Sequence, residues 1–194
     1  GEQLEGCNDY LVISKPDAVE HVHRSFLAVG VDVIETNTFR ANRITLGEYG
    51  LDNQVLDINR SAARLARSLA NEYSTAEKPR FVAGAVGPTG KLPSADDPDL
   101  SDISFDELVD VFAEQAQGLI EGGVDLLLIE TSQDILEVKA AIHGFQKAFK
   151  QTGISLPIQA QVTLDTTGRM LLGTDMGAAL NILERLPIDI IGLN

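Results

Sequence analysis

Carboxylates, hydroxyls and amides come directly after apolar segments of this sequence, where they could bind a small polar ligand. Glu130 and Thr131 follow one almost unbroken apolar run, and Glu35 begins a polar turn after another. A carboxylate after a buried strand must be solvated or paired, because an isolated buried charge is costly. Strand ends also meet polar loops in any protein, so each residue alone fits a structural role too. The residues of this kind are Glu35, Thr36, Asn37, Thr38, Thr89, Glu130, Thr131, Thr163, Asp165 and Asn194.

Motifs for other chemistries are incomplete. Residues 84–90 read GAVGPTG, which is GxxGxxG and not the GxGxxG of dinucleotide-binding loops, and Pro88 lacks an amide donor. Neither a nucleophile elbow nor a Walker lysine motif occurs. His21 and His23 are two residues apart on a predicted helix, so they do not share a face, and His143 belongs to another helix. The sequence therefore offers no catalytic centre and no metal site of its own.

Apolar runs of strand length alternate with amphipathic helices. The runs are nearly continuous in Val, Ile, Leu and Ala, which is typical of parallel strands that are buried on both faces. The predicted strands are 31–36, 81–87, 124–131, 158–163 and 188–194. The first predicted helix starts at Pro16 and buries Val19, Val22 and Phe26, and the last covers 175–185 and buries Met176, Leu180 and Leu183. Between them we predict helices over 53–73 and 135–149, and one that starts with a Ser104–Glu107 capping box.

The order of these elements predicts an α/β fold, a (β/α)8 TIM barrel that is incomplete in this chain. Residues 30–36 (GVDVIET) and 123–131 (GVDLLLIET) repeat one pattern, which favours a barrel over an open doubly wound sheet. A whole barrel has eight strands. We expect residues 1–194 to be one partial domain with a leading loop over 1–15, about strands 2 to 6, and unpaired edges at 31–36 and 188–194. In such a barrel the polar residues after the strands would converge on one rim.

Composition narrows the class of protein. The formal net charge is −14, which argues against nucleic acid as a partner. Cys7 is the only cysteine, so no internal disulfide can form, and it lies without a neighbouring ligand in the leading segment. No apolar run reaches the roughly 18 residues that a membrane span needs. We therefore expect a cytoplasmic protein with no membrane partner.

Five segments of the chain resemble the homocysteine S-methyltransferase family. They are residues 8–12 (NDYLV) with Lys15 and Pro16, 30–39 (GVDVIETNTF), 82–89 (VAGAVGPT), 121–131 (EGGVDLLLIET) and 191–194 (IGLN). They occur in uninterrupted order from about Gly6 to Asn194. Within the family they are most similar to the N-terminal homocysteine-binding module of cobalamin-dependent methionine synthases.

The resemblance implies zinc-dependent methyl transfer to the sulfur of homocysteine, which belongs to methionine biosynthesis. Three cysteine thiolates would hold the Zn(II), which lowers the pKa of the substrate thiol. Glu130 matches the family's carboxylate near the substrate ammonium, and Thr131, Glu35, Asn37, Thr38 and Asn194 would line the same pocket. Methylcobalamin would be the methyl donor, with cobalamin- and folate-binding modules in the same polypeptide.

The chain also departs from the family. The first zinc cysteine is expected directly after Asn194 and a cysteine pair later, while the family's opening strand and last two strands have no counterpart here. We therefore expect these residues alone to be inactive, as a piece of a longer polypeptide. The alternatives are a betaine- or S-methylmethionine-dependent homocysteine methyltransferase, a non-catalytic barrel remnant acting as a binding scaffold, and an unrelated barrel enzyme for phosphorylated substrates that would use the segment near Gly87.

Overall fold

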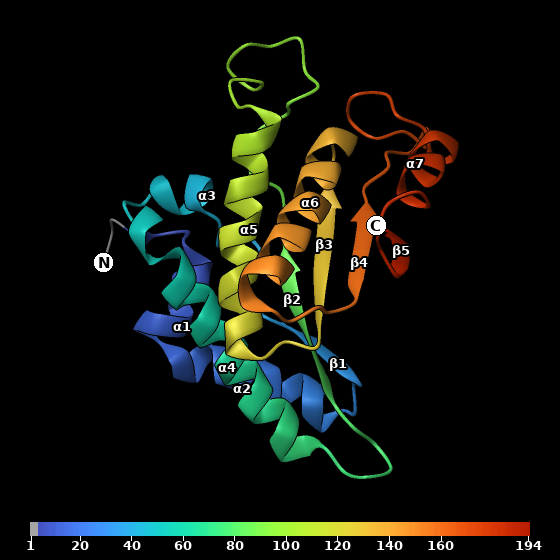
Figure 1. The fold of residues 1–194 in the computed structure, drawn as a ribbon. Helices are drawn as coiled ribbons and strands as arrows, with labels where there is room; N and C mark the ends of the chain where they lie inside the picture. Colours follow the sequence, from blue (N-terminus) through green and yellow to red (C-terminus); the bar gives the residue numbers. More distant parts are fainter. Residues whose placement is uncertain (1–3) are drawn as a thin grey trace.

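The strands of residues 4–194, which the computed structural model describes, form one parallel sheet whose order follows the chain (Figure 1). In a doubly wound sheet the strand order reverses at a switch point, but here each strand pairs with the next one along the sequence. This sequential order is that of a barrel wall. The strands are β1 (Val33–Glu35), β2 (Phe81–Val86), β3 (Leu126–Ser132), β4 (Ile158–Val162) and β5 (Ile190–Leu193).

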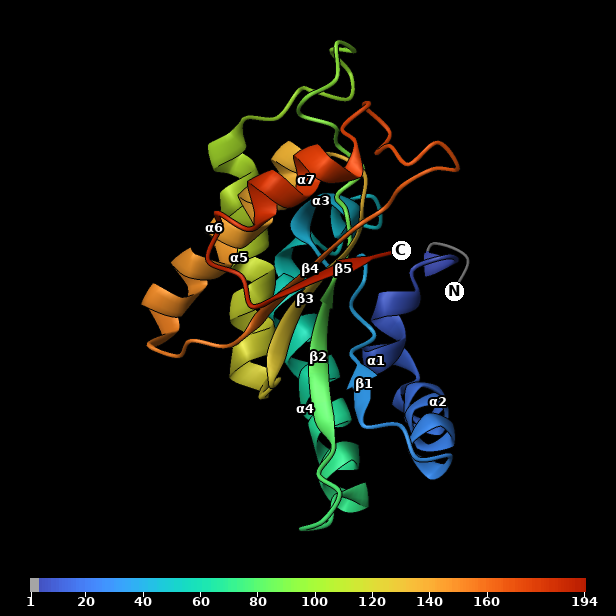
Figure 2. The same cartoon turned by 90° about the vertical axis from the view of Figure 1, so that its right-hand side faces the viewer.

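Three long helices cover one face of the sheet. Figure 2 shows α4, α5 and α6 on one side of the strands, and α1 and α2 beside the edge strand β1, where α2 packs against α4. No helix in residues 4–194 combines the length and the apolar character that a bilayer crossing requires. The helices are α1 (Leu11–Ser14), α2 (Pro16–Ala28), α3 (Arg43–Gly47), α4 (Val55–Tyr73), α5 (Phe105–Gly122), α6 (Ile135–Thr152) and α7 (Met176–Leu183), with short 3-10 turns at Asn8–Tyr10 and Asp52–Gln54.

The main core lies between this helical layer and the sheet. Phe112, Ile142 and Phe145 are fully buried there against strand residues such as Leu127. Glycine allows the helices to approach closely, because a Cβ on Gly118 of α5 would lie 2.8 Å from the Cβ of Asn59 on α4. The predicted capping box also forms, since the Ser104 side chain accepts a bond from the Glu107 amide and the Glu107 carboxylate accepts one in return.

The predicted leading loop over 1–15 is wrong for residues 8–14, which form a 3-10 turn and α1. Residues 1–3 lie outside the described part of the chain. Cys7 and Val12 are buried in a second, smaller core with Leu46 and Val55. A helix of four residues is about one turn and is too short to show a helical period. The sequence pattern therefore could not predict its burial.

Three residues predicted to face inward are instead exposed. Val22 and Phe26 of α2 are 51% and 55% exposed, and they line a groove of about 570 Å³ beside the free edge of β1, while Val19, His23 and Leu27 are buried. Leu180 of α7 is 42% exposed. Helical spacing identifies an apolar face, but it does not say what covers that face.

Burial of the strands on both faces holds for β2 but not for the whole sheet. The two predicted edges are indeed β1 and β5, and both strands expose side chains because each has a neighbour on one side only. In β4 burial alternates from residue to residue. One face of the sheet is therefore covered by helices, and the opposite face, called the inner face below, is open around β4 and β5.

Candidate functional site

Glu130 lies on the inner face of the sheet near the carboxyl end of β3. Its neighbours Leu127 and Ile129 point into the helical core, so Glu130 points the other way. Partial burial raises the pKa of Glu130 to about 7, and the negative charge of Glu35, at the end of β1, adds to this shift. The two predicted carboxylates are therefore close enough to repel each other. A ligand cation between them would relieve that repulsion.

An irregularity in β3 follows Glu130 directly. The register between β3 and β4 shifts between Ile129 and Ser132, as in a β-bulge. Thr131, inside this bulge, has a φ of 60°, and it is the one residue other than glycine with positive φ among residues 4–194. A β-branched side chain rarely adopts this conformation, so the backbone is strained at this point. Strain of this kind concentrates at functional sites.

Asn194 connects the ends of three neighbouring strands. Its side-chain Nδ2 donates to Thr131 Oγ1 at 3.3 Å, and its Oδ1 accepts a bond from Thr163 Oγ1 at 3.1 Å. Asn194 therefore lies on the same side of the molecule as Glu130, next to the bulge. In the structure, Thr131, Thr163 and Asn194 lie together on one rim, as predicted.

The polar turn after β1 also lies at this rim, but its hydroxyls bind within the protein. Thr38 is fully buried, its Oγ1 lies 2.6 Å from Thr36 Oγ1, and it donates to the carbonyl of Ala85 at 2.7 Å. Asn37 is partly exposed and donates to the carbonyl of Asn8 at 2.8 Å. The side chains of Thr36 and Thr38 thus attach the turn to the end of β2, and Glu35 is the exposed member of the group.

Two buried carboxylates at the start of α6 hold the loop that follows β2. Glu137 Oε1 accepts bonds from the amide and the hydroxyl of Thr89, at 2.8 and 2.6 Å. Asp134, the N-cap of α6, accepts the same pair of bonds from Ser94, both at 2.8 Å. We call these four residues the loop clasp. Sequence reasoning placed Thr89 at the rim but missed its partners, because acidic residues in a first helical turn are common.

Glu137 is a charged group in an unusual environment. The residue is 1% exposed, and Oε2 has no hydrogen-bond partner among residues 4–194. Burial raises the pKa of Glu137 to about 7, against the opposing effect of the bonds from Thr89. The carboxyl is therefore partly protonated near neutral pH. Asp165, by contrast, is exposed in the loop after β4, where bonds from Thr167 lower its pKa.

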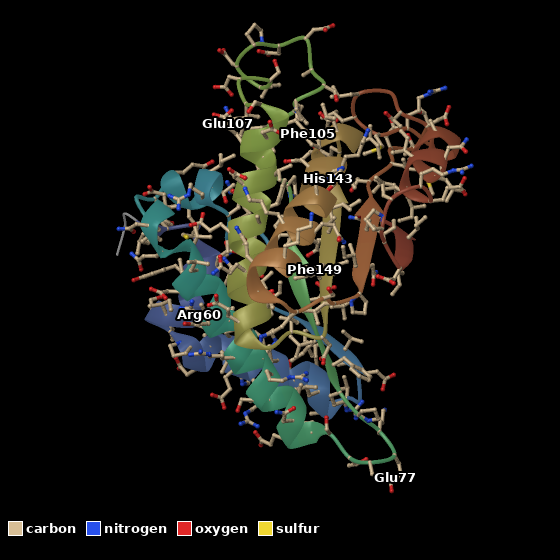
Figure 3. The ribbon with its side chains drawn as sticks, in the orientation of Figure 1. Arg60, Glu77, Phe105, Glu107, His143 and Phe149 are labelled. Atoms are coloured by element: carbon tan, nitrogen blue, oxygen red, sulfur yellow. The ribbon has the colours of Figure 1, made fainter. Side chains whose placement is uncertain are left out.

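The residues present do not fit a zinc ion held by three thiolates. In the described part of the chain, no group of three or more His, Cys, Asp or Glu side chains could hold a metal. Cys7 is buried, and that burial raises the pKa of its thiol. His143 stacks edge-on against Phe105 between α5 and α6, with ring centroids 5.7 Å apart (Figure 3). His23 is buried in α2, and His21 is exposed.

These features define an α/β protein of the barrel class, with a polar site where the parallel strands end. The comparisons with known proteins agree. The family model for homocysteine S-methyltransferase matches residues 1–194. The methionine synthase of Mycobacterium tuberculosis is 40% identical over 191 residues, and that of Mycobacterium leprae is 41% identical over the same length. The chain belongs to the homocysteine S-methyltransferase family, as the sequence motifs predicted.

The chain is much shorter than these relatives. The matched region is 98% of this chain but only 16% of the Mycobacterium tuberculosis protein and 15% of the Mycobacterium leprae protein. Among solved structures, the metallated form of the homocysteine methyltransferase MmuM from Escherichia coli superposes with a TM-score of 0.79, at 19% identity, over 96% of this chain and 66% of that one. This likeness confirms the α/β fold, with this chain as part of the barrel.

Proposed function

We propose that the polypeptide containing this chain transfers a methyl group to the sulfur of homocysteine, which makes methionine. In this proposal the chain is part of a single homocysteine-binding barrel domain. The observation that carries it is Glu130, a partly buried carboxylate at the rim, with Thr131 and Asn194 beside it. The 40% identity with a methionine synthase supports this activity over the other functions considered.

Glu130 would bind the substrate ammonium. Before the substrate arrives, burial and the charge of Glu35 keep part of Glu130 protonated near neutral pH. An ammonium group at the rim favours the ionised carboxylate, so binding releases a proton. The bulge at Thr131 and the bond from Asn194 would keep the end of β3 in place. Glu35 and Asn37, both at the same rim, would complete the polar wall of the pocket.

The metal and the methyl donor belong to other parts of the proposed enzyme. Because residues 4–194 do not fit a zinc site, we assign no step of the reaction to the metal here. In this proposal the Zn(II) ligands lie outside residues 1–194, and methylcobalamin donates the methyl group. Cobalamin- and folate-binding modules belong to the same polypeptide, which is cytoplasmic. The identity with methionine synthases favours this donor over betaine or S-methylmethionine.

The test is homocysteine methylation by the full-length protein with each of the three donors. We expect turnover with methylcobalamin. Substituting Glu130→Gln should raise the KM for homocysteine about tenfold and leave the zinc content unchanged, because it removes a charge that faces the ammonium. Glu184→Gln, at an exposed position after α7, is the matched control. No turnover with any donor would favour the binding scaffold, and an unchanged KM would exclude Glu130 from the pocket.

A further inference from the structure

Gln161 of β4 lies in the same row of the sheet as Glu130. The pairs Ile129–Ala160 and Ser132–Val162 set the register between β3 and β4, so Glu130 and Thr131 together stand opposite Gln161. On the next strand Gln161 pairs with Gly192. We call Glu130, Gln161 and Gly192 the strand-end row.

The side chain of Gln161 shares the inner face with Glu130. Ala160 and Val162, its neighbours in β4, are buried in the helical core, so Gln161 points to the opposite face. It lies over Gly192, where a Cβ would come within 2.7 Å of Gln161 Cγ. Glycine at this position therefore provides the space that the Gln161 side chain occupies. A larger residue would push the amide away from the row.

The carboxamide of Gln161 is available to a ligand. Gln161 is partly exposed, and its amide forms no hydrogen bond with any residue in 4–194. An amide offers two N–H donors and one acceptor oxygen, and it carries no charge. It can therefore bind a carboxylate beside the acidic Glu130 without adding to the repulsion that Glu35 already exerts there.

We propose that Gln161 determines specificity for an α-amino acid by donating its amide N–H to the substrate carboxylate. The inference rests on the proposed function, in which Glu130 takes the ammonium of the same substrate. In an α-amino acid the two charged groups are attached to one carbon. Side chains on neighbouring strands, about 4.8 Å apart, can reach both groups together. The strand-end row would then distinguish a zwitterion from a simple thiol, a simple amine or a simple acid.

The experiment measures ligand binding by calorimetry to the full-length, zinc-loaded protein. The probes are homocysteine, aminopropanethiol, which lacks the carboxylate, and mercaptobutyrate, which lacks the ammonium. We expect Gln161→Leu to weaken the binding of homocysteine and of mercaptobutyrate about 10- to 100-fold, because a hydrogen bond to a charged group is lost, and to leave the binding of aminopropanethiol unchanged. Glu130→Gln should instead weaken the binding of homocysteine and of aminopropanethiol and leave that of mercaptobutyrate unchanged.

Two further variants make the result decisive. Gln159→Leu changes the same residue type on the same face two residues earlier in β4, and we expect no loss of homocysteine binding. Gln161→Met keeps the length of the side chain without the amide, so it replaces Gln161→Leu if that variant does not fold. Equal weakening of all three probes, or no weakening of homocysteine, would overturn the role of Gln161. If the unmodified protein binds no homocysteine, the proposed function itself fails, and this inference fails with it.

Discussion

The two faces of the sheet differ in how favourable an environment they give to their residues. On the helix-covered face, Ile129, Ile158 and Ala160 are buried among apolar side chains of the helical layer. On the inner face of the same sheet, Glu130 is partly buried, the charge of Glu35 raises its pKa further, and the backbone of Thr131 is strained. Proteins depart from favourable local rules chiefly at functional sites. The proposed function therefore separates stability and ligand binding onto opposite faces of one sheet.

The largest effect should come from the helix-covered face. Ile142 of α6 is fully buried, so Ile142→Ala should lower the free energy of unfolding by roughly 2–5 kcal/mol through lost burial and the cavity left behind. The measurement is urea titration of the full-length protein, followed by hydrogen exchange of the α5 and α6 amides. Gln159→Leu, on the inner face, is the control and should change little. A loss below about 1 kcal/mol for Ile142→Ala would contradict the proposed separation of the faces.

A smaller, pH-dependent effect is expected at the loop clasp. The pKa of Glu137 is raised in the folded protein from 4.5 to about 7. The folded state therefore holds a proton that the unfolded state has released, and this stabilising contribution is fully present below pH 4.5 and lost as the pH rises through 7. At about 1.36 kcal/mol per pKa unit, the contribution is on the order of 3 kcal/mol.

Glu137→Gln should remove this part of the pH dependence, because the amide does not titrate. The variant should be close in stability to the unmodified protein at pH 5, where both buried side chains are neutral, and more stable at pH 8, where only Glu137 is charged. Hydrogen exchange of the loop after β2 at both pH values measures this, since the bonds from Thr89 hold that loop. Glu184→Gln serves as the exposed control. Identical pH profiles for Glu137→Gln and the unmodified protein would mean that Glu137 stays ionised.

Much of the helix-covered face could be predicted from the sequence. Continuous apolar runs predicted the five strands, and helical spacing predicted the helices that the structure has as α5 and α6, because burial on one face imposes a period on the sequence. The exposed Val22 and Phe26 mark the limit of this reasoning. They have the same spacing as a buried stripe, but burial also depends on which neighbouring element covers the helix.

The inner face could be predicted only in part. A parallel sheet brings the residues after its strands to one rim, and Thr131 and Asn194 are in fact hydrogen-bonded there. The sequence could not tell hydroxyls that bind within the protein, such as Thr38, from groups that remain available. Gln161 was missed although the alternation IQAQV in β4 contained the signal, since a period of two means that one face is not covered by apolar neighbours.

The smallest effect on stability, and the sharpest test of the inner face, is expected at Thr131. Glycine adopts positive φ freely, so Thr131→Gly relieves backbone strain, but it also raises the entropy of the unfolded chain. These effects oppose each other, and the free energy of unfolding should change by less than about 1 kcal/mol. The substitution also removes the hydroxyl that accepts the bond from Asn194 and frees the bulge beside Glu130.

Homocysteine binding by the Thr131→Gly variant should therefore weaken several-fold while stability is nearly unchanged, as calorimetry and urea titration would measure. Thr131→Ser keeps the hydroxyl and should retain most of the binding. A loss of stability without a loss of binding would show that the bulge serves the fold and not the site. The proposed separation between the two faces would then not hold for β3.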